Sequence, residues 1–178
     1  MSTTFPGTTI EVATLEKGSS KSLFDGIFAT GGITLSQVCI MTGLEPYLVQ
    51  NWVKRGFVGH PVARVYSREQ FARIIIINML RDSMQIEYIC HAVNDVLSDC
   101  NFGENELYHL YVNMIAAEDI NALNENEVMC AAEKATEGVF EGLPHIRKKT
   151  VQLLCVMLYA HNSASLRALA QTTLAVLQ

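Results

Sequence analysis

Charged residues are scarce in this sequence: they make up 17% of its 178 residues, against 49% hydrophobic residues. Disordered chains have the opposite balance, so the composition predicts an ordered globular protein. Such a low charged fraction also indicates that part of an apolar surface is covered by another subunit. The net charge of -5 at pH 7, taken alone, argues against binding to nucleic acid.

Segments typical of membrane insertion or secretion are missing as well. The longest apolar run near the C-terminus covers residues 151–160, well short of the about 20 residues that a membrane-spanning helix needs. The N-terminus lacks the basic start and the continuous apolar stretch of a secretory signal. We therefore expect a cytoplasmic protein that does not associate with a membrane.

Cysteine and histidine show no pattern typical of metal binding or catalysis. The five cysteines are odd in number and none has C-x-x-C spacing, so we expect buried thiols rather than a zinc site or disulfides. The one adjacent pair, Cys90 and His91, would point about 100° apart on a helix, which makes a poor metal clamp. Phosphate-binding glycine loops are also absent. The sequence predicts no enzyme, no cofactor and no metal.

Residues 33–89 form the most informative segment, and their first half predicts two short helices joined by a tight turn. Thr34 is a good N-cap for the first helix. Gly43 is expected to end it, because a residue without Cβ adopts the left-handed conformation readily. Pro46 suits the first turn of the second helix, whose apolar residues include Val49 and Trp52. Two helices held at a steep angle by a glycine turn are the unit that places a helix in a DNA major groove.

A short basic hairpin, or wing, and a longer helix are expected next. Residues 62–66 contain β-formers next to a Gly and a Pro, which predicts the hairpin. Ser67 and Gln70 form a capping-box pattern at the start of the helix. The four isoleucines Ile74–Ile77 favour a strand by propensity, but the neighbouring apolar residues keep helical phase, and we predict a helix.

The chain is expected to divide into a loose N-terminal arm (1–22), a winged helix-turn-helix module (23–100) that opens with a short helix, and an acidic all-α region (101–178). In the last part, Asn124 is a predicted cap for a helix extending to residue 141, with Met129 and Val139 facing inward. The final segment reads as one long helix or as two helices joined near Asn162.

Charge is distributed unevenly along these parts. Residues 34–81 carry six basic side chains and two acids, whereas residues 91–142 carry eleven acids and Lys134 alone. One basic module and one acidic region indicate that only the first faces phosphate groups. The predicted DNA-binding residues are Tyr47, Gln50, Asn51, Lys54, Arg55, Arg64, Arg68 and Arg73. The cations would contact phosphates, while Gln50 and Asn51 are the best candidates to read adenine edges.

The module resembles the MerR-like group of winged helix-turn-helix regulators. The resemblance rests on Thr34, Leu35, Val38 and Cys39 in the first helix, on Trp52, Gly56, Phe57 and Val58 after the turn, on Pro61, Arg64, Tyr66 and Ser67 in the wing, and on Leu80 to Ile86. The sequence is more similar still to a bacterial family that is a domain of unknown function, through the runs 31–38, 42–46, 50–56 and 77–83. The resemblance implies a mostly α fold and a DNA-binding regulator.

Two functions remain open at this level. The first is a transcription regulator that binds double-stranded DNA as a homodimer, inserts the helix 45–55 into the major groove and pairs through its C-terminal helices. The alternative is a protein-interaction module of the same fold that no longer reads DNA. It is motivated by the short wing, by Asn51 where the MerR-like helix carries Arg, and by the net acidic charge. Nothing in the residues of the acidic region identifies a small-molecule effector.

Overall fold

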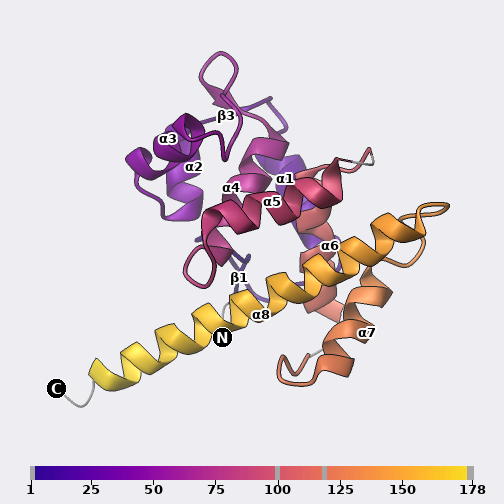
Figure 1. The fold of residues 1–178 in the computed structure, drawn as a ribbon. Helices are drawn as coiled ribbons and strands as arrows, with labels where there is room; N and C mark the ends of the chain where they lie inside the picture. The colour runs from indigo at the N-terminus through magenta and orange to yellow at the C-terminus, as the bar shows by residue number, and fades with distance from the viewer. Residues whose placement is uncertain (1–2, 99–100, 118–119, 176–178) are drawn as a thin grey trace.

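The computed structural model describes residues 3–98, 101–117 and 120–175, and this part of the chain is mostly helical, as predicted (Figure 1). Four two-residue strands form two antiparallel pairs, β1 with β2 and β3 with β4. The strands are β1 Thr3–Thr4, β2 Glu11–Val12, β3 Ile33–Thr34 and β4 Val65–Tyr66. The helices in the described ranges are α1 Ser19–Ile27, α2 Leu35–Thr42, α3 Pro46–Lys54, α4 Arg68–Leu80, α5 Ile86–Leu97, α6 Glu104–Ala117, α7 Glu125–Ala135 and α8 Pro144–Ala175.

Helix α4 lies at the centre of the core. It packs against α5, α6 and α8, and residues 74–77 are at most 1% exposed. The predicted helix is therefore confirmed, and the four isoleucines have a physical reason: a helix surrounded by others needs apolar residues on every side. Aromatic residues extend this core toward α1 and α6, where the Phe24 ring lies 5.6 Å from Phe71 and 5.8 Å from Tyr108.

The predicted helix-start and helix-end signals are confirmed. The Thr34 hydroxyl accepts the Gln37 backbone N–H while the Gln37 side chain accepts that of Thr34, and Ser67 and Gln70 repeat this arrangement before α4. Asn124 caps α7 through the N–H groups of residues 126 and 127. Gly43 ends α2 with a φ of 69°. Each of these bonds joins residues close in sequence, which is why the sequence predicts them.

The expectation of a loose N-terminal arm is wrong for residues 3–18. Phe5 is 2% exposed, and the backbone oxygen of Pro6 accepts a hydrogen bond of 2.9 Å from the Tyr108 hydroxyl of α6. The Asn78 side-chain amide of α4 donates to the backbone oxygens of both Gly7 and Thr42 at 3.0 Å. The segment has no periodic apolar pattern because a few single contacts, rather than a helix face, hold it against the core.

The hairpin prediction for residues 62–66 is only partly correct. Val62 and Val65 form one antiparallel bridge, with a backbone hydrogen bond of 3.0 Å closing the turn. The longer pairing joins β4 to β3, a strand that the sequence did not predict. Gly32 permits this approach, because a Cβ there would lie 2.8 Å from the Val65 side chain. Residues 62–65 thus form a tight turn that leads into β4, and β4 pairs with β3, the strand that precedes α2.

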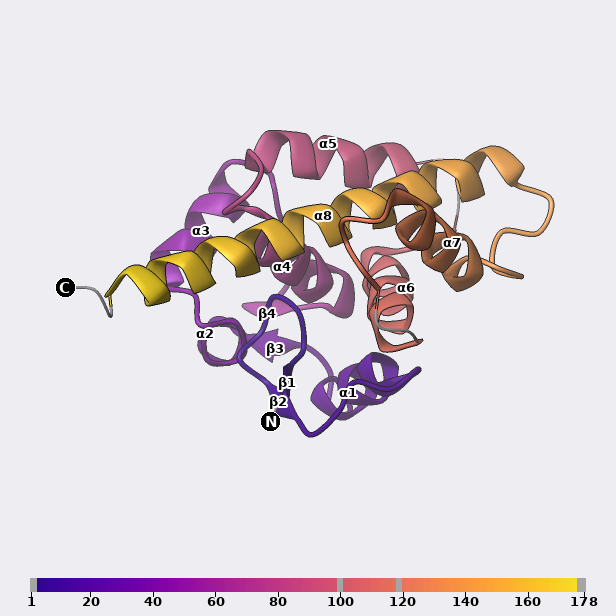
Figure 2. The same ribbon diagram turned by 90° about the horizontal axis from the view of Figure 1, so that it is seen from below.

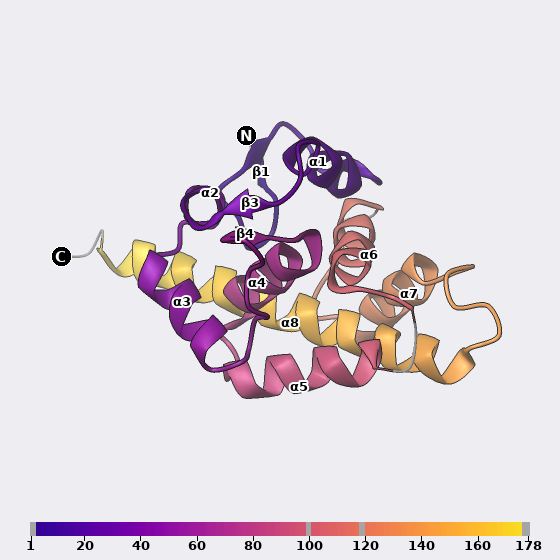
Figure 3. The same ribbon diagram turned by 90° about the horizontal axis from the view of Figure 1, so that it is seen from above.

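The helix predicted over residues 124–141 ends earlier, at Ala135. Met129 and Val139, expected to face inward, are 42% and 41% exposed. The chain turns after α7 through Gly138, whose φ is 72°. The last segment is one helix, α8, which crosses the whole molecule and extends beyond the other helices at its C-terminal end (Figures 2 and 3). Within the described ranges, no helix combines the length and hydropathy that crossing a membrane requires.

Candidate nucleic-acid interface

Helix α3 has one buried face and one exposed face. Val49, Trp52 and Val53 are at most 8% exposed and pack into the core. The opposite face presents polar side chains together with one aromatic ring that is 66% exposed. These exposed residues are Tyr47, Gln50, Asn51 and Lys54. The helical spacing thus brings four of the eight predicted contact residues to one accessible surface.

The wing turn lies next to this surface. A groove of about 400 Å³ separates α3 from the turn, and both Gln50 and Arg64 line it, together with His60 and Pro61. Arg64 occupies the tip of the turn with a φ of 65°, and the preceding Ala63 has a φ of 49°. Positive φ at both central residues is the geometry of a type I′ hairpin turn. The turn thus places the exposed Arg64 in the lining of the same groove as Gln50 of α3.

Arg55 and Arg68 are engaged in contacts within the protein. A terminal guanidinium nitrogen of Arg55 lies 2.5 Å from the Glu87 carboxylate of α5, and the group covers the Phe57 ring at 4.5 Å. Arg68 donates to Asp25 of α1 at 2.7 Å, and this hydrogen bond lowers the pKa of that carboxyl group. Exposed pairs of this kind contribute little to stability, but they engage both guanidinium groups within the chain.

Arg73 does not lie on the outer surface, where the sequence predicted a phosphate contact. Its side chain is 13% exposed, and its three nitrogens bind three different partners. Nε donates to the Phe57 backbone oxygen, one terminal nitrogen to Glu104 and the other to Asn94, each at 2.6 Å. Two of these partners, on α5 and α6, are distant in sequence, so helical periodicity within residues 68–81 gave no sign of the burial.

Lys54 and Arg64 are the two predicted cations that form no salt bridge within the described residues. Two further residues close to α3 or the turn, His60 and Arg81, were not among the contacts predicted from the sequence. His60 lines the groove beside Arg64, and its position in the loop before the wing was the available signal. The guanidinium carbon of Arg81, the residue after α4, lies 5.9 Å from the centre of the Trp52 ring of α3, and no local pattern indicated that contact.

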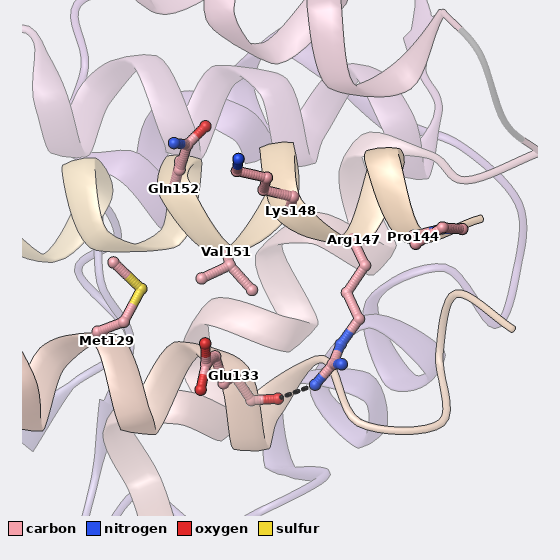
Figure 4. A pocket seen from close by; sticks show the side chains of 7 residues that line it. All are labelled: Met129, Glu133, Pro144, Arg147, Lys148, Val151 and Gln152. Carbon is pink, nitrogen blue, oxygen red and sulfur yellow. Dashed lines mark hydrogen bonds between the residues drawn. The ribbon is translucent and has the colours of Figure 1, made fainter.

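A second groove, of about 340 Å³, lies between α7 and α8 (Figure 4). Met129 and Val151 provide apolar walls, and Arg147 and Lys148 bring positive charge. Arg147 is already bonded within the protein, at 3.1 Å to the Glu133 backbone oxygen and 3.3 Å to the Thr136 hydroxyl. Across the described parts of the chain, no cluster of three His, Cys, Asp or Glu side chains could hold a metal ion.

Comparison with known proteins places this surface in a recognised segment. Residues 35–114 match the family described as a domain of unknown function, DUF1836. The match begins with α2 and ends within α6, so it includes α3, the wing, Arg73 and Glu104. The expected similarity to a bacterial domain of unknown function is therefore confirmed. The resemblance to MerR-like regulators is not tested by this match and stays a prediction.

A curated relative extends the comparison. The chain is 28% identical over 120 residues to the uncharacterized protein YkrK of Bacillus subtilis (strain 168). The aligned region covers 59% of this chain and 51% of the relative, so the chain spans about half the length of the curated protein it matches. No solved structure matches the chain.

Proposed function

We propose that this protein binds double-stranded DNA, with α2, α3 and the turn before β4 acting as a winged helix-turn-helix with a short wing. The observation that carries the proposal is the shared groove: Gln50 of α3 and Arg64 of the wing line it together. In this reading α3 enters the major groove and the wing follows the adjacent backbone, as in other proteins that use this motif.

The chemistry of the exposed side chains fits this division of roles. Gln50 and Asn51 carry amides that can bond adenine N6 and N7, while Tyr47 can reach a phosphate or a thymine methyl group. Lys54 and Arg64 supply cations without a salt bridge among the described residues, and such cations position a protein on phosphates. Arg55, Arg68 and Arg73 are left out of the primary set, because each is paired with a carboxylate of the same chain.

The proposed regulator acts as a homodimer. In the second half of α8, Leu166, Leu169 and Leu174 are between 56% and 63% exposed, which is unusual for leucines on one helix. Pairing through this segment would cover them and present two α3 helices to two half-sites. Sedimentation of the wild type against Leu166→Ser/Leu169→Ser tests the pairing: the wild type should sediment as a dimer and the variant as a monomer. Identical sedimentation of the two proteins would remove the dimer from the proposal.

Capture of genomic DNA fragments at several salt concentrations tests DNA binding itself. A shared sequence motif among the captured fragments is expected, and log affinity should fall linearly with log salt concentration. The comparison variant is Lys54→Ala/Arg64→Ala, which removes the two predicted cations that form no salt bridge among the described residues and should reduce both affinity and slope. Absence of any enriched motif, or binding that is insensitive to salt, would refute the proposal.

A protein-interaction module is the second candidate, and one observation favours it. Three of the five predicted phosphate contacts are bound to acidic residues of the same chain, which leaves a small basic surface. Under this hypothesis the α3 face would dock on an acidic protein, and the wild type would bind no DNA even at low salt. Cross-linking at an introduced Gln50→Cys, followed by identification of the partner, would separate the two functions.

A further inference from the structure

The connection after α3 is tied to the start of α6 through a single arginine. The backbone oxygen of Trp52, in the last turn of α3, accepts the N–H of Phe57 at 2.9 Å. The carbonyl of that same Phe57 accepts Nε of Arg73 at 2.6 Å. Arg73 in turn is paired with Glu104, the first residue of α6, at 2.6 Å. Trp52, Phe57, Arg73 and Glu104 therefore form a continuous bonded path from α3 to α6.

The Arg73–Glu104 pair is largely buried, although both residues line a surface groove beside Phe57. The side chains of Arg73 and Glu104 are 13% and 19% exposed, against 37% and 55% for Arg68 and Asp25. Breaking a buried pair leaves an uncompensated charge, so such a pair constrains its surroundings far more than an exposed one. The planar guanidinium also fixes how its partners are oriented, because each of its three nitrogens forms a hydrogen bond to a different segment of the chain.

The start of α6 is fastened to α4 by a second contact. The Glu69 carboxylate accepts the backbone N–H of Asn105 at 3.0 Å. Burial raises the pKa of Glu69, the Asn105 hydrogen bond lowers it, and the negative charges of Glu106 and Glu104 raise it further. The first turn of α6, which carries Glu104, is thus fastened to α4, the helix that also carries Arg73.

We propose that Arg73 is a positioning residue, and that its pair with Glu104 sets the position of α3 and therefore of the DNA-facing side chains. The inference rests on the proposed function only for its DNA readout. It assigns the acidic region a role: the N-terminus of α6 supports the recognition surface. A displacement of α6 would therefore be transmitted to α3 through Arg73 and the Phe57 backbone oxygen.

The test uses three variants of the full chain: Arg73→Lys, Glu104→Gln and the two combined. Both single changes keep a hydrogen-bonding group but weaken the pair, which makes them milder than truncation to Ala. The matched control is Arg68→Lys with Asp25→Asn. That pair has the same chemistry and starts on the same helix, but it leads to α1 instead of the connection after α3.

The first measurement needs no DNA. Trp52 is the only tryptophan of the chain, it belongs to α3 and it is 2% exposed, so its fluorescence reports the packing of α3. In samples with wild-type circular dichroism, Arg73→Lys and Glu104→Gln should raise quenching by acrylamide and shift the emission to longer wavelength. The combined variant should add little beyond either single change, because both act on one path. The control variants should match the wild type.

The second measurement is DNA affinity against salt concentration. A positioning residue predicts that affinity falls on the order of fivefold or more while the salt slope stays unchanged. Wild-type Trp52 fluorescence in the folded variants would overturn the inference. So would a loss of about one in the slope when the charge is removed by Arg73→Gln, because that result would make Arg73 a phosphate contact. If the wild type binds no DNA, the proposed function fails, yet the fluorescence result still decides whether Arg73 positions α3.

Discussion

Gln50 and Arg64 line the same groove, although fourteen positions in the sequence separate them and one belongs to a helix and the other to a turn. Ala63 and Arg64 both have positive φ, so the turn is tight and Arg64 stays close to α3. An amide suited to base edges and a guanidinium suited to phosphates thereby share one surface.

Arg64→Ala should weaken binding to all DNA sequences alike and reduce the salt slope by about one, because one phosphate contact is lost. Gln50→Ala should instead relax the preference at one base position, at a cost of about 1–3 kcal/mol for the preferred base. Binding titrations on a panel of singly substituted sites measure both effects. Arg68→Ala serves as the control and should change neither quantity. A loss of slope in Arg68→Ala equal to that in Arg64→Ala would contradict the assignment of contacts.

The wing turn should become more stable when its first central residue suits a left-handed backbone. Ala63 has a φ of 49°, a conformation that costs an ordinary L-residue about 1–2 kcal/mol. Asn tolerates this conformation well, so Ala63→Asn should raise the melting temperature by up to about 4 °C. Ala63→Val should lower it, because a β-branched residue is disfavoured there. Equal melting temperatures for the two variants would show that the turn has another geometry in solution.

Docking of the N-terminal segment can be tested by two glycine substitutions with opposite expected signs. Gly7 has a φ of 74°, and a Cβ at this position would lie 2.4 Å from the Ile75 backbone oxygen. Gly7→Ala should therefore destabilise the protein by about 1–3 kcal/mol from backbone strain, with the clash adding to this. Gly26 lies in α1 with open space around it, and Gly26→Ala should stabilise by up to about 1 kcal/mol. Chemical denaturation measures both; a neutral Gly7→Ala would mean that the segment is not docked.

Acidification should destabilise the contact between α6 and α8. His161 Nδ1 lies 2.7 Å from the Tyr111 hydroxyl, and burial lowers the pKa of His161. Burial likewise lowers the pKa of His109, which bonds Ser20. Below the ordinary histidine pKa of about 6.5 the unfolded chain binds more protons than the folded chain, so the free energy of unfolding falls as the pH falls. Above that pH these groups bind no protons in either state and contribute no pH dependence.

Denaturation curves between pH 8 and pH 5 check this sign. His161→Gln/His109→Gln, which cannot titrate in this range, should flatten the decline near pH 6.5 relative to the wild type. Tyr111→Phe is the control: it removes the hydroxyl but leaves His161 buried, so the decline should persist at lower overall stability. A wild-type protein whose stability rises on acidification would contradict the buried, neutral state of these histidines.

Much of the local structure of this protein could be predicted because the decisive contacts are local. Thr34, Ser67 and Asn124 bond backbone groups two or three residues away, and Gly43 ends α2 through its own backbone conformation. The exposed face of α3 follows equally from helical periodicity, since Val49 and Trp52 must turn inward together. The sequence alone therefore determined the starts of α2, α4 and α7, the turn between α2 and α3, and four of the candidate contact residues.

Tertiary structure decided which basic residues remain available and where the N-terminal segment lies. Arg68 and Arg73 are similar in sequence context, but five helical positions turn their side chains about 140° apart. Arg68 faces solvent and pairs with Asp25 of α1, whereas Arg73 pairs with Glu104 of α6. No local sequence pattern indicates that α6 packs there. The N-terminal segment is likewise held by Tyr108 of α6 and Asn78 of α4, which are distant in the sequence. Periodicity reports whether a residue faces inward or outward on its own helix; the partner on that side is set by segments distant in the chain.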